Sequence, residues 1–214
     1  VDTAPDLVNA HKHVMKKFGF ETKATDDIKK LVGRGAKSLI YRSIYNTAKK
    51  EFRKFTDEST KEEMVKEFID YYGRNINNES RIIDGVTDFL SWCKNEKISM
   101  GVCTNKQEHL AIDLLKKIKI YDYFEYVAGS NTFEYCKPDP RHLTSVLEIM
   151  DGSIKKSVMI GDSETDADSA KNCGMKFILL EDGYTEKKVS EIHHDHLIKN
   201  FIGLEKIVKN YLND

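Results

Sequence analysis

Proline, tryptophan and cysteine are scarce in this chain of 214 residues, and it contains no long apolar run. There are three prolines, one tryptophan and four cysteines, and no two cysteines form a Cys-x-x-Cys pair. A disulfide scaffold is therefore not indicated, and we expect reduced thiols in a cytoplasmic protein. No window approaches the roughly 18 to 20 apolar residues that cross a bilayer, so we expect no membrane partner.

An excess of charge of one sign is also missing. The chain has 34 basic and 35 acidic residues, a net charge of −1, and its lysines are interleaved with acids and apolar residues at helical spacing. This pattern argues against a nucleic-acid partner. With 40% hydrophobic residues the chain can fold as one large domain or as a core with a smaller lobe. The sequence leaves the oligomeric state open.

The hydrophobic period changes once along the chain, after Asp84-Gly85. Before this point the apolar residues recur at helical spacing, which predicts an all-helical lobe over residues 4–82. Beyond it, over residues 83–214, short apolar strands alternate with amphipathic helices, which indicates an α/β domain with a parallel sheet covered on both faces. The strands are predicted near residues 98–103, 124–128, 157–160 and 177–180.

The most informative segment follows the third of these strands. Its apolar run ends in Gly161, and four acidic residues then occur within seven positions: Asp162, Glu164, Asp166 and Asp168. Oxygen ligands of this kind suit Mg²⁺, which usually takes one or two protein carboxylates. The alternative is that Ser163 or Asp162 caps the next helix and the other acids are solvated.

Polar residues also follow two other strands. Thr104 and Asn105 come directly after the first strand, and Lys137 follows the second strand after a loop. Ligands of parallel sheets bind at the carboxyl ends of the strands, so these side chains are expected to share one edge with Asp162. Together they predict a site in which Thr104 and Lys137 hold phosphate oxygens while Asp162 and Asp166 hold Mg²⁺. Taken singly, Thr104 is more often a helix cap, and a lysine before proline is usually a solvated loop residue.

Three motifs in this order resemble those of the haloacid dehalogenase (HAD) superfamily, in its phosphoglycolate phosphatase-like branch. They are Gly-Val-Cys-Thr-Asn-Lys at 101–106, Cys-Lys-Pro-Asp-Pro at 136–140 and Ile-Gly-Asp-Ser-Glu-Thr-Asp at 160–166. The resemblance implies a three-layer, Rossmann-like α/β core over residues 83–214 and an inserted all-helical cap over residues 4–82.

The resemblance also implies a function: a Mg²⁺-dependent phosphoric monoester hydrolase acting on a small phosphorylated metabolite, best matched by 2-phosphoglycolate, through an aspartyl-phosphate. Thr104 and Lys137 would be catalytic, Asn105 would help to orient the phosphoryl group, and Arg34 with Gly35 would contact the substrate from the cap. The alternative for Arg34 is a solvated residue after a helix that ends at Gly33.

One departure from the family pattern affects both fold and chemistry. Members open with a strand that leads into Asp-x-Asp-Gly-Thr, whereas this chain starts at Val1-Asp2-Thr3, which resembles the tail of that motif. The resemblance thus implies that the central first strand and both of its catalytic carboxylates precede Val1, and that the chain as written is inactive. A sugar-phosphate mutase, a pyrophosphatase and a catalytically silent HAD-like chain remain as alternatives.

Overall fold

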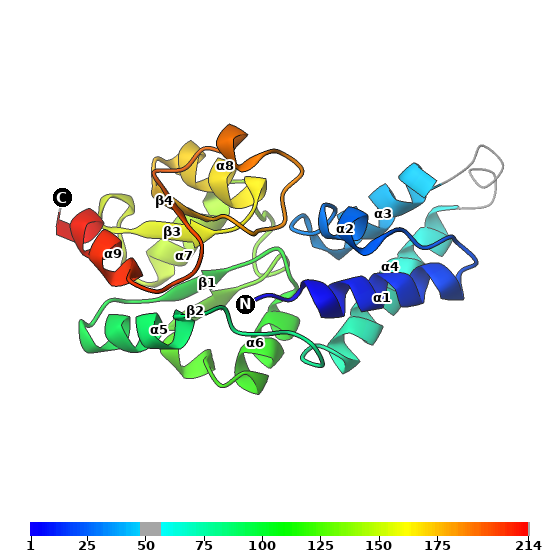
Figure 1. The fold of residues 1–214 in the computed structure, drawn as a ribbon, viewed down its shortest axis with the longest axis horizontal. Helices are drawn as coiled ribbons and strands as arrows, with labels where there is room; N and C mark the ends of the chain where they lie inside the picture. Colours follow the sequence, from blue (N-terminus) through cyan, green and yellow to red (C-terminus); the bar gives the residue numbers. More distant parts are fainter. Residues whose placement is uncertain (48–56, 214) are drawn as a thin grey trace. The chain divides into compact units, whose positions relative to one another are not determined.

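The computed structural model describes residues 1–47 and 57–213, which form two compact units, Val1–Arg81 and Ile82–Asp214 (Figure 1). We call the first the helical unit and the second the α/β unit.

Amphipathic helices packed on one another build the helical unit. It contains α1 (Ala4–Lys17), α2 (Thr25–Lys29), α3 (Gly35–Thr47) and α4 (Glu58–Arg74). The longest of these, α4, begins where the Asp57 carboxylate accepts a hydrogen bond from the Thr60 N–H at 2.7 Å. Its buried residues Met64, Phe68 and Tyr72 recur every four positions, and this stripe faces α1 and α3.

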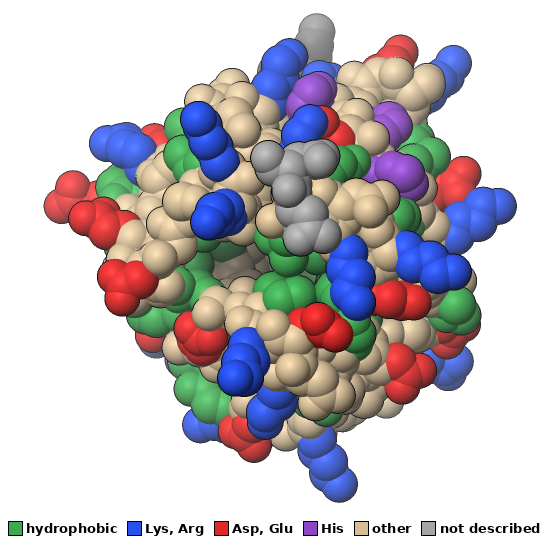
Figure 2. Space-filling view, turned by 90° about the vertical axis from the view of Figure 1, so that its left-hand side faces the viewer, with side chains coloured by type: hydrophobic (Ala, Val, Ile, Leu, Met, Phe, Trp, Pro, Cys, Tyr) green, Lys and Arg blue, Asp and Glu red, His purple; other side chains and the backbone are tan. Residues whose placement is uncertain are grey.

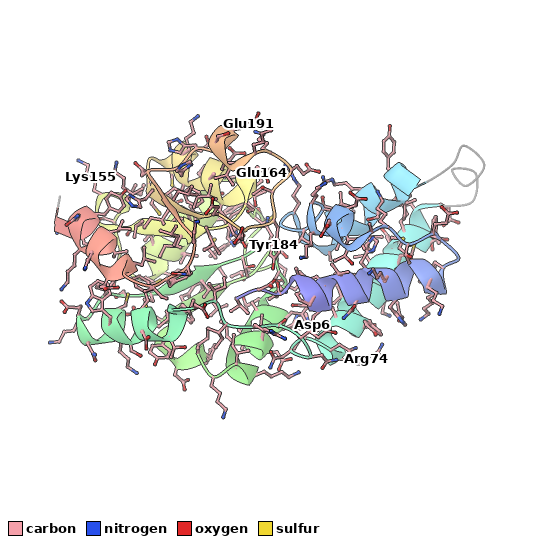
Figure 3. The ribbon with its side chains drawn as sticks, in the orientation of Figure 1. Asp6, Arg74, Lys155, Glu164, Tyr184 and Glu191 are labelled. Atoms are coloured by element: carbon pink, nitrogen blue, oxygen red, sulfur yellow. The ribbon has the colours of Figure 1, made fainter. Side chains whose placement is uncertain are left out.

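A buried carboxylate ties together the two ends of the helical unit. Asp6, near the start of α1, accepts hydrogen bonds from the backbone N–H groups of Glu79 at 3.0 Å and Ser80 at 2.8 Å, and from the Ser80 hydroxyl at 2.6 Å (Figure 3). Asp2 and Arg81 form an antiparallel bridge beside it. The incoming and outgoing chains of this unit are therefore held side by side.

The α/β unit alternates helices with short parallel strands. Its helices are α5 (Val86–Asn95), α6 (Glu108–Lys117), α7 (Arg141–Ile149), α8 (Glu164–Cys173) and α9 (Leu204–Asn213). Its strands are β1 (Gly101–Cys103), β2 (Tyr126–Ala128), β3 (Val158–Gly161), β4 (Lys176–Leu180) and β5 (His196–Ile198). β1 pairs with β2, β3 with β4 and β4 with β5, and all three pairs are parallel.

Strand β4 shows how both faces of the sheet are covered. Alternate residues of a strand point to opposite faces. Phe177 and Leu179 join a core cluster with residues of α7 and α8, whereas Ile178 and Leu180 join a cluster with residues of α5 and α9. The unit therefore has three layers, as predicted from the sequence.

The strands form two separate sheets, because β1 and β3 are not hydrogen-bonded to each other. Both sheets contribute to the same cores: Met100, next to β1, packs in one cluster with Val158 and Ile160 of β3. All four residues of β3 are only half-buried, whereas Phe177 to Leu179 of β4 are fully buried. Figure 2 shows one face of the molecule, with a hollow among hydrophobic side chains.

The predicted α/β class and its four strands are confirmed, with ends that shift by up to three residues. β5 was not predicted, because it follows the largely polar run Glu191 to Asp195 and two of its three residues are exposed. Within the described residues, no helix is both long and apolar enough to cross a membrane.

Gly85, in the turn that opens the α/β unit, allows a test of its packing. Gly85 and Gly174 both have positive φ, 81° and 74°, where a side chain costs about 1 to 2 kcal/mol. A Cβ on Gly85 would lie 2.6 Å from the Ile202 nitrogen, whereas a Cβ on Gly174 meets nothing within 4 Å. In urea unfolding we expect Gly174→Ala to lose about 1 kcal/mol and Gly85→Ala about 1 kcal/mol or more beyond that. Equal losses would show that the contact with the segment before α9 is unimportant.

Candidate active site

Most of the polar residues predicted to share one edge of the sheet lie close together. Asn105 follows β1, and its Nδ2 donates to the backbone carbonyl of Lys137 at 3.0 Å. Lys137 Nζ donates to Asp166 Oδ1 at 2.6 Å, and the N–H of Asp162 donates to Asp166 Oδ2 at 3.0 Å. One connected network therefore joins the segments that follow β1, β2 and β3.

Lys137 is the centre of this network. Its ammonium group donates to the carbonyl oxygen of Cys103, the last residue of β1, and to Asp166 in the helix that follows β3. The side chain is only 7% exposed. Although burial alone would lower it, the carboxylate of Asp166 raises the pKa of Lys137 above its ordinary value. A permanent positive charge thus lies between the carboxyl ends of the two sheets.

Asp166 uses both carboxylate oxygens in contacts within the protein. Oδ1 accepts from Lys137, and Oδ2 accepts from the backbone N–H groups of Asp162 and Ser163 and from the Ser163 hydroxyl at 2.7 Å. Ser163 and Asp166 also form a capping box at the start of α8. Burial opposes its ionisation, but the charge and hydrogen bond of Lys137 hold the pKa of Asp166 below its usual value.

Asp162 differs from Asp166 in having no such partners. Its carboxylate forms no hydrogen bond to another residue in the described part of the chain. Burial, and then the negative charge of Asp166, raise the pKa of Asp162 to about 6. A carboxylate that is desolvated next to another carboxylate attracts a cation. The helix-capping interpretation of the acidic turn is therefore confirmed for Ser163, whereas the metal-binding interpretation of Asp162 stays a prediction.

A loop after β4 fixes the position of Asp162. Glu164, at the start of α8, is buried, and its Oε1 accepts from the backbone N–H groups of Glu186 at 2.7 Å and Lys187 at 2.8 Å. In the same loop, beside Tyr184, a Cβ on Gly183 would lie 2.0 Å from the backbone oxygen of Asp162 (Figure 3). Only glycine permits this close approach.

The remaining predicted residues have other surroundings. The Thr104 hydroxyl accepts from the Lys106 N–H at 3.1 Å, a contact within the turn before α6. The N-cap of α6 is Gln107, so Thr104 does not cap that helix. Arg34 and Gly35 belong to the helical unit, where Arg34 is exposed just before α3. Asp168 is exposed on α8.

Sequence reasoning missed one residue of the network. His142, in the first turn of α7, accepts a hydrogen bond at Nδ1 from the backbone N–H of Lys137 at 3.2 Å. A histidine next to a Pro-Asp-Pro turn carries no pattern that would reveal a bond to the backbone five residues earlier.

Comparison with known proteins places this chain in a family. The model of the haloacid dehalogenase-like hydrolases matches residues 1–180. Phosphoglycolate phosphatase of Caulobacter vibrioides is 34% identical over 206 residues, which cover 96% of this chain and 85% of that protein. The phosphoglycolate phosphatase of Agrobacterium fabrum is 34% identical over 204 residues, which cover 95% of this chain and 85% of that protein.

Solved structures show the same fold at lower identity. A predicted phosphoglycolate phosphatase from Haemophilus somnus 129pt has a TM-score of 0.90 and 23% identity, with 96% of this chain and 92% of that chain covered. A β-phosphoglucomutase from Clostridium difficile has a TM-score of 0.78 and 19% identity, with 100% of this chain and 92% of that chain covered. On the family match and the relatives of 34% identity, this chain belongs to the haloacid dehalogenase-like hydrolases.

Proposed function

We propose that the protein is a Mg²⁺-dependent phosphatase that hydrolyses a small phosphate monoester, with 2-phosphoglycolate as the best substrate. The observation that carries the proposal is the carboxylate of Asp162, whose pKa is raised by burial and by the charge of Asp166, near the buried ammonium of Lys137. The first can hold a cation, and the second can neutralise phosphate oxygens. The choice of substrate is supported by the relatives named phosphoglycolate phosphatase.

The residues present fit a magnesium ion with few protein ligands. Asp162 has free carboxylate oxygens, and Mg²⁺ usually takes one or two carboxylates and fills its other positions with water and phosphate. We assign Asp162 as the direct ligand and Asp166 as the second residue of the metal site, linked to it through the Asp162 backbone and to Lys137. When bound, the ion offsets the repulsion between the phosphate group and the carboxylates.

A further strand between β1 and β3 would complete the site. Among the described residues, β1 and β3 each lie at an edge of their sheet, although both strands pack on the same core, and buried backbone groups are normally paired. We propose that a segment preceding Val1 supplies this strand, with two carboxylates at its end beside Lys137. The α/β domain would then comprise this strand together with residues 83–214.

The proposed reaction has two steps. A carboxylate of the added strand attacks phosphorus, and the ester oxygen leaves as an alcohol with a proton from the second carboxylate. Water then attacks the aspartyl-phosphate, and inorganic phosphate leaves. Lys137 faces the charge that develops on the phosphoryl oxygens, Thr104 and Asn105 orient the group, and Asn105 also holds the Lys137 carbonyl.

We assign the cap predicted over residues 4–82 to the helical unit, Val1–Arg81, and propose that it excludes water during the reaction. Arg34, exposed before α3, would pair with a substrate carboxylate, and Gly35 would let the backbone approach the substrate.

The activity can be tested with the full-length protein and a panel of phosphate esters. We expect release of inorganic phosphate from 2-phosphoglycolate that needs Mg²⁺ and stops with EDTA. Pyrophosphate as the preferred substrate, or isomerisation of a hexose phosphate without phosphate release, would replace the proposal by one of the alternatives. No reaction with any ester would contradict it.

Lys137 should be essential to this activity. Lys137→Met is expected to lower kcat by about 100-fold or more, because the positive charge that faces the phosphate is lost. It also leaves the buried charge of Asp166 without its positive counter-charge, which costs about 3 to 5 kcal/mol of stability. The Lys137→Met/Asp166→Asn double variant should regain much of that stability and remain inactive, while Lys155→Met, at an exposed site, should match the wild type. A stable and active double variant would exclude the role of Lys137.

Binding of Mg²⁺ can be measured without an assay of activity. We expect several millimolar Mg²⁺ to raise the midpoint of thermal unfolding of the wild type and of Asp168→Asn by a few degrees, because a ligand bound only by the folded state stabilises it. Asp162→Asn should not respond, and in EDTA it should be more stable than the wild type because one buried charge is removed. An unchanged response of Asp162→Asn would refute the metal assignment.

A further inference from the structure

We infer that His142 is a positioning residue for phosphoryl transfer, which acts by holding the backbone of Lys137. The inference rests on the phosphate-binding role proposed above for Lys137, and it adds a residue that has no contact with the phosphate itself.

The ring of His142 is fully enclosed and oriented. The residue has 0% exposure, and its ring meets that of Phe133 edge-on, with centroids 5.8 Å apart and planes at 83°. In this orientation Nδ1 accepts the hydrogen bond from the Lys137 N–H at 3.2 Å. The bond closes the turn that leads from Lys137 through Asp139 into α7, where the His142 N–H in turn donates to the Asp139 carbonyl at 3.2 Å.

The bond requires a neutral imidazole with its proton on Nε2. Burial, and then the positive charge of Lys137, lower the pKa of His142 to about 4. Asp139, the acidic group that acts on the ring, raises the pKa only as a smaller effect. Protonation would convert Nδ1 into a second donor aimed at the Lys137 N–H, so the neutral ring is the form that keeps the network intact at neutral pH.

Histidine is a costly residue for this pocket. Nε2 is buried, and it has no hydrogen-bond partner of normal geometry in the described part of the chain. The backbone of Gly129 supplies only a weaker interaction with the ring. An unsatisfied buried donor destabilises the folded protein, and an apolar side chain of similar size would avoid this loss. The imidazole has one property that an apolar side chain lacks: its Nδ1 accepts a hydrogen bond from the Lys137 N–H.

With this bond, every polar group of Lys137 has a partner. The N–H donates to His142, the carbonyl accepts from Asn105, and the ammonium donates to Cys103 and Asp166. Without the hydrogen bond to His142, the backbone of Lys137 is held less firmly, and the ammonium group of the same residue can shift. A displacement of about 1 Å in a catalytic group can cost about 100-fold in rate.

Two substitutions of His142 separate positioning from packing. His142→Leu keeps the bulk and removes the acceptor, whereas His142→Asn keeps an acceptor oxygen close to the position of Nδ1. In the full-length protein we expect His142→Leu to lower kcat for 2-phosphoglycolate by about 10-fold or more, with KM changed less than about threefold. His142→Asn should recover kcat to within about threefold of the wild type.

A matched control is available at the other fully buried histidine. His11, with 0% exposure and a pKa also lowered to about 4, donates to or accepts from Ser43 at 2.7 Å within the helical unit. His11→Leu should lose stability while kcat stays within about threefold of the wild type. If kcat falls equally in His11→Leu and His142→Leu, or if His142→Leu retains the wild-type kcat, the inference is wrong.

An NMR measurement tests the hydrogen bond even if the proposed substrate class fails. The ring of His142 should show a deprotonated Nδ1 and a protonated Nε2 from pH 5.5 to 8. The backbone amide of Lys137 should be protected from hydrogen exchange in the wild type and in His142→Asn, and unprotected in His142→Leu. Protection that is equal in all three proteins would overturn the inference, whereas absence of phosphatase activity with the expected protection would count against the proposed function alone.

Discussion

The ion pair between Lys137 and Asp166 is the contact on which the rest of the site depends. Both side chains are more than 90% buried, and the distance between Nζ and Oδ1 is 2.6 Å. Burying two charges is expensive, and their attraction compensates only when hydrogen bonds satisfy the remaining donors and acceptors. Here Cys103 accepts from the ammonium, and Ser163 and Asp162 donate to the carboxylate. The pair therefore draws the ends of two separate sheets toward one point.

The acidic residues of the turn after β3 have different roles: some form contacts within the protein, and Asp162 is the proposed metal ligand. Ser163 and Asp166 cap α8, and Glu164 anchors the loop after β4. These contacts leave Asp162 in a desolvated position next to another carboxylate, with its own carboxylate free. The neighbouring contacts hold Asp162 where burial and the charge of Asp166 raise its pKa, and a bound cation would relieve that repulsion. We interpret this imbalance as the physical basis of the proposed magnesium site.

The fold could be predicted from the sequence because its elements carry their own periodicity. The buried run Phe177 to Leu180 and the four-residue spacing of Met64, Phe68 and Tyr72 are readable without coordinates. The parallel topology then predicted that residues after different strands meet at one edge, as Asn105 and Lys137 do. A contact between a side chain and the backbone of another segment produces no periodic pattern in the sequence. The roles of His142 and of the loop at Gly183 were therefore found only from the three-dimensional arrangement.

The ammonium group of Lys137 offers the most direct test of this account, through its ¹⁵N and proton NMR signals in the full-length protein. We expect a separate ammonium signal in slow exchange with water, still charged at pH 10, which moves when Asp166 is replaced by asparagine. This result would show that the charge is buried against Asp166 and available to a phosphate group. An ammonium that exchanges as rapidly as those of exposed lysines, and does not respond to Asp166→Asn, would contradict the central claim.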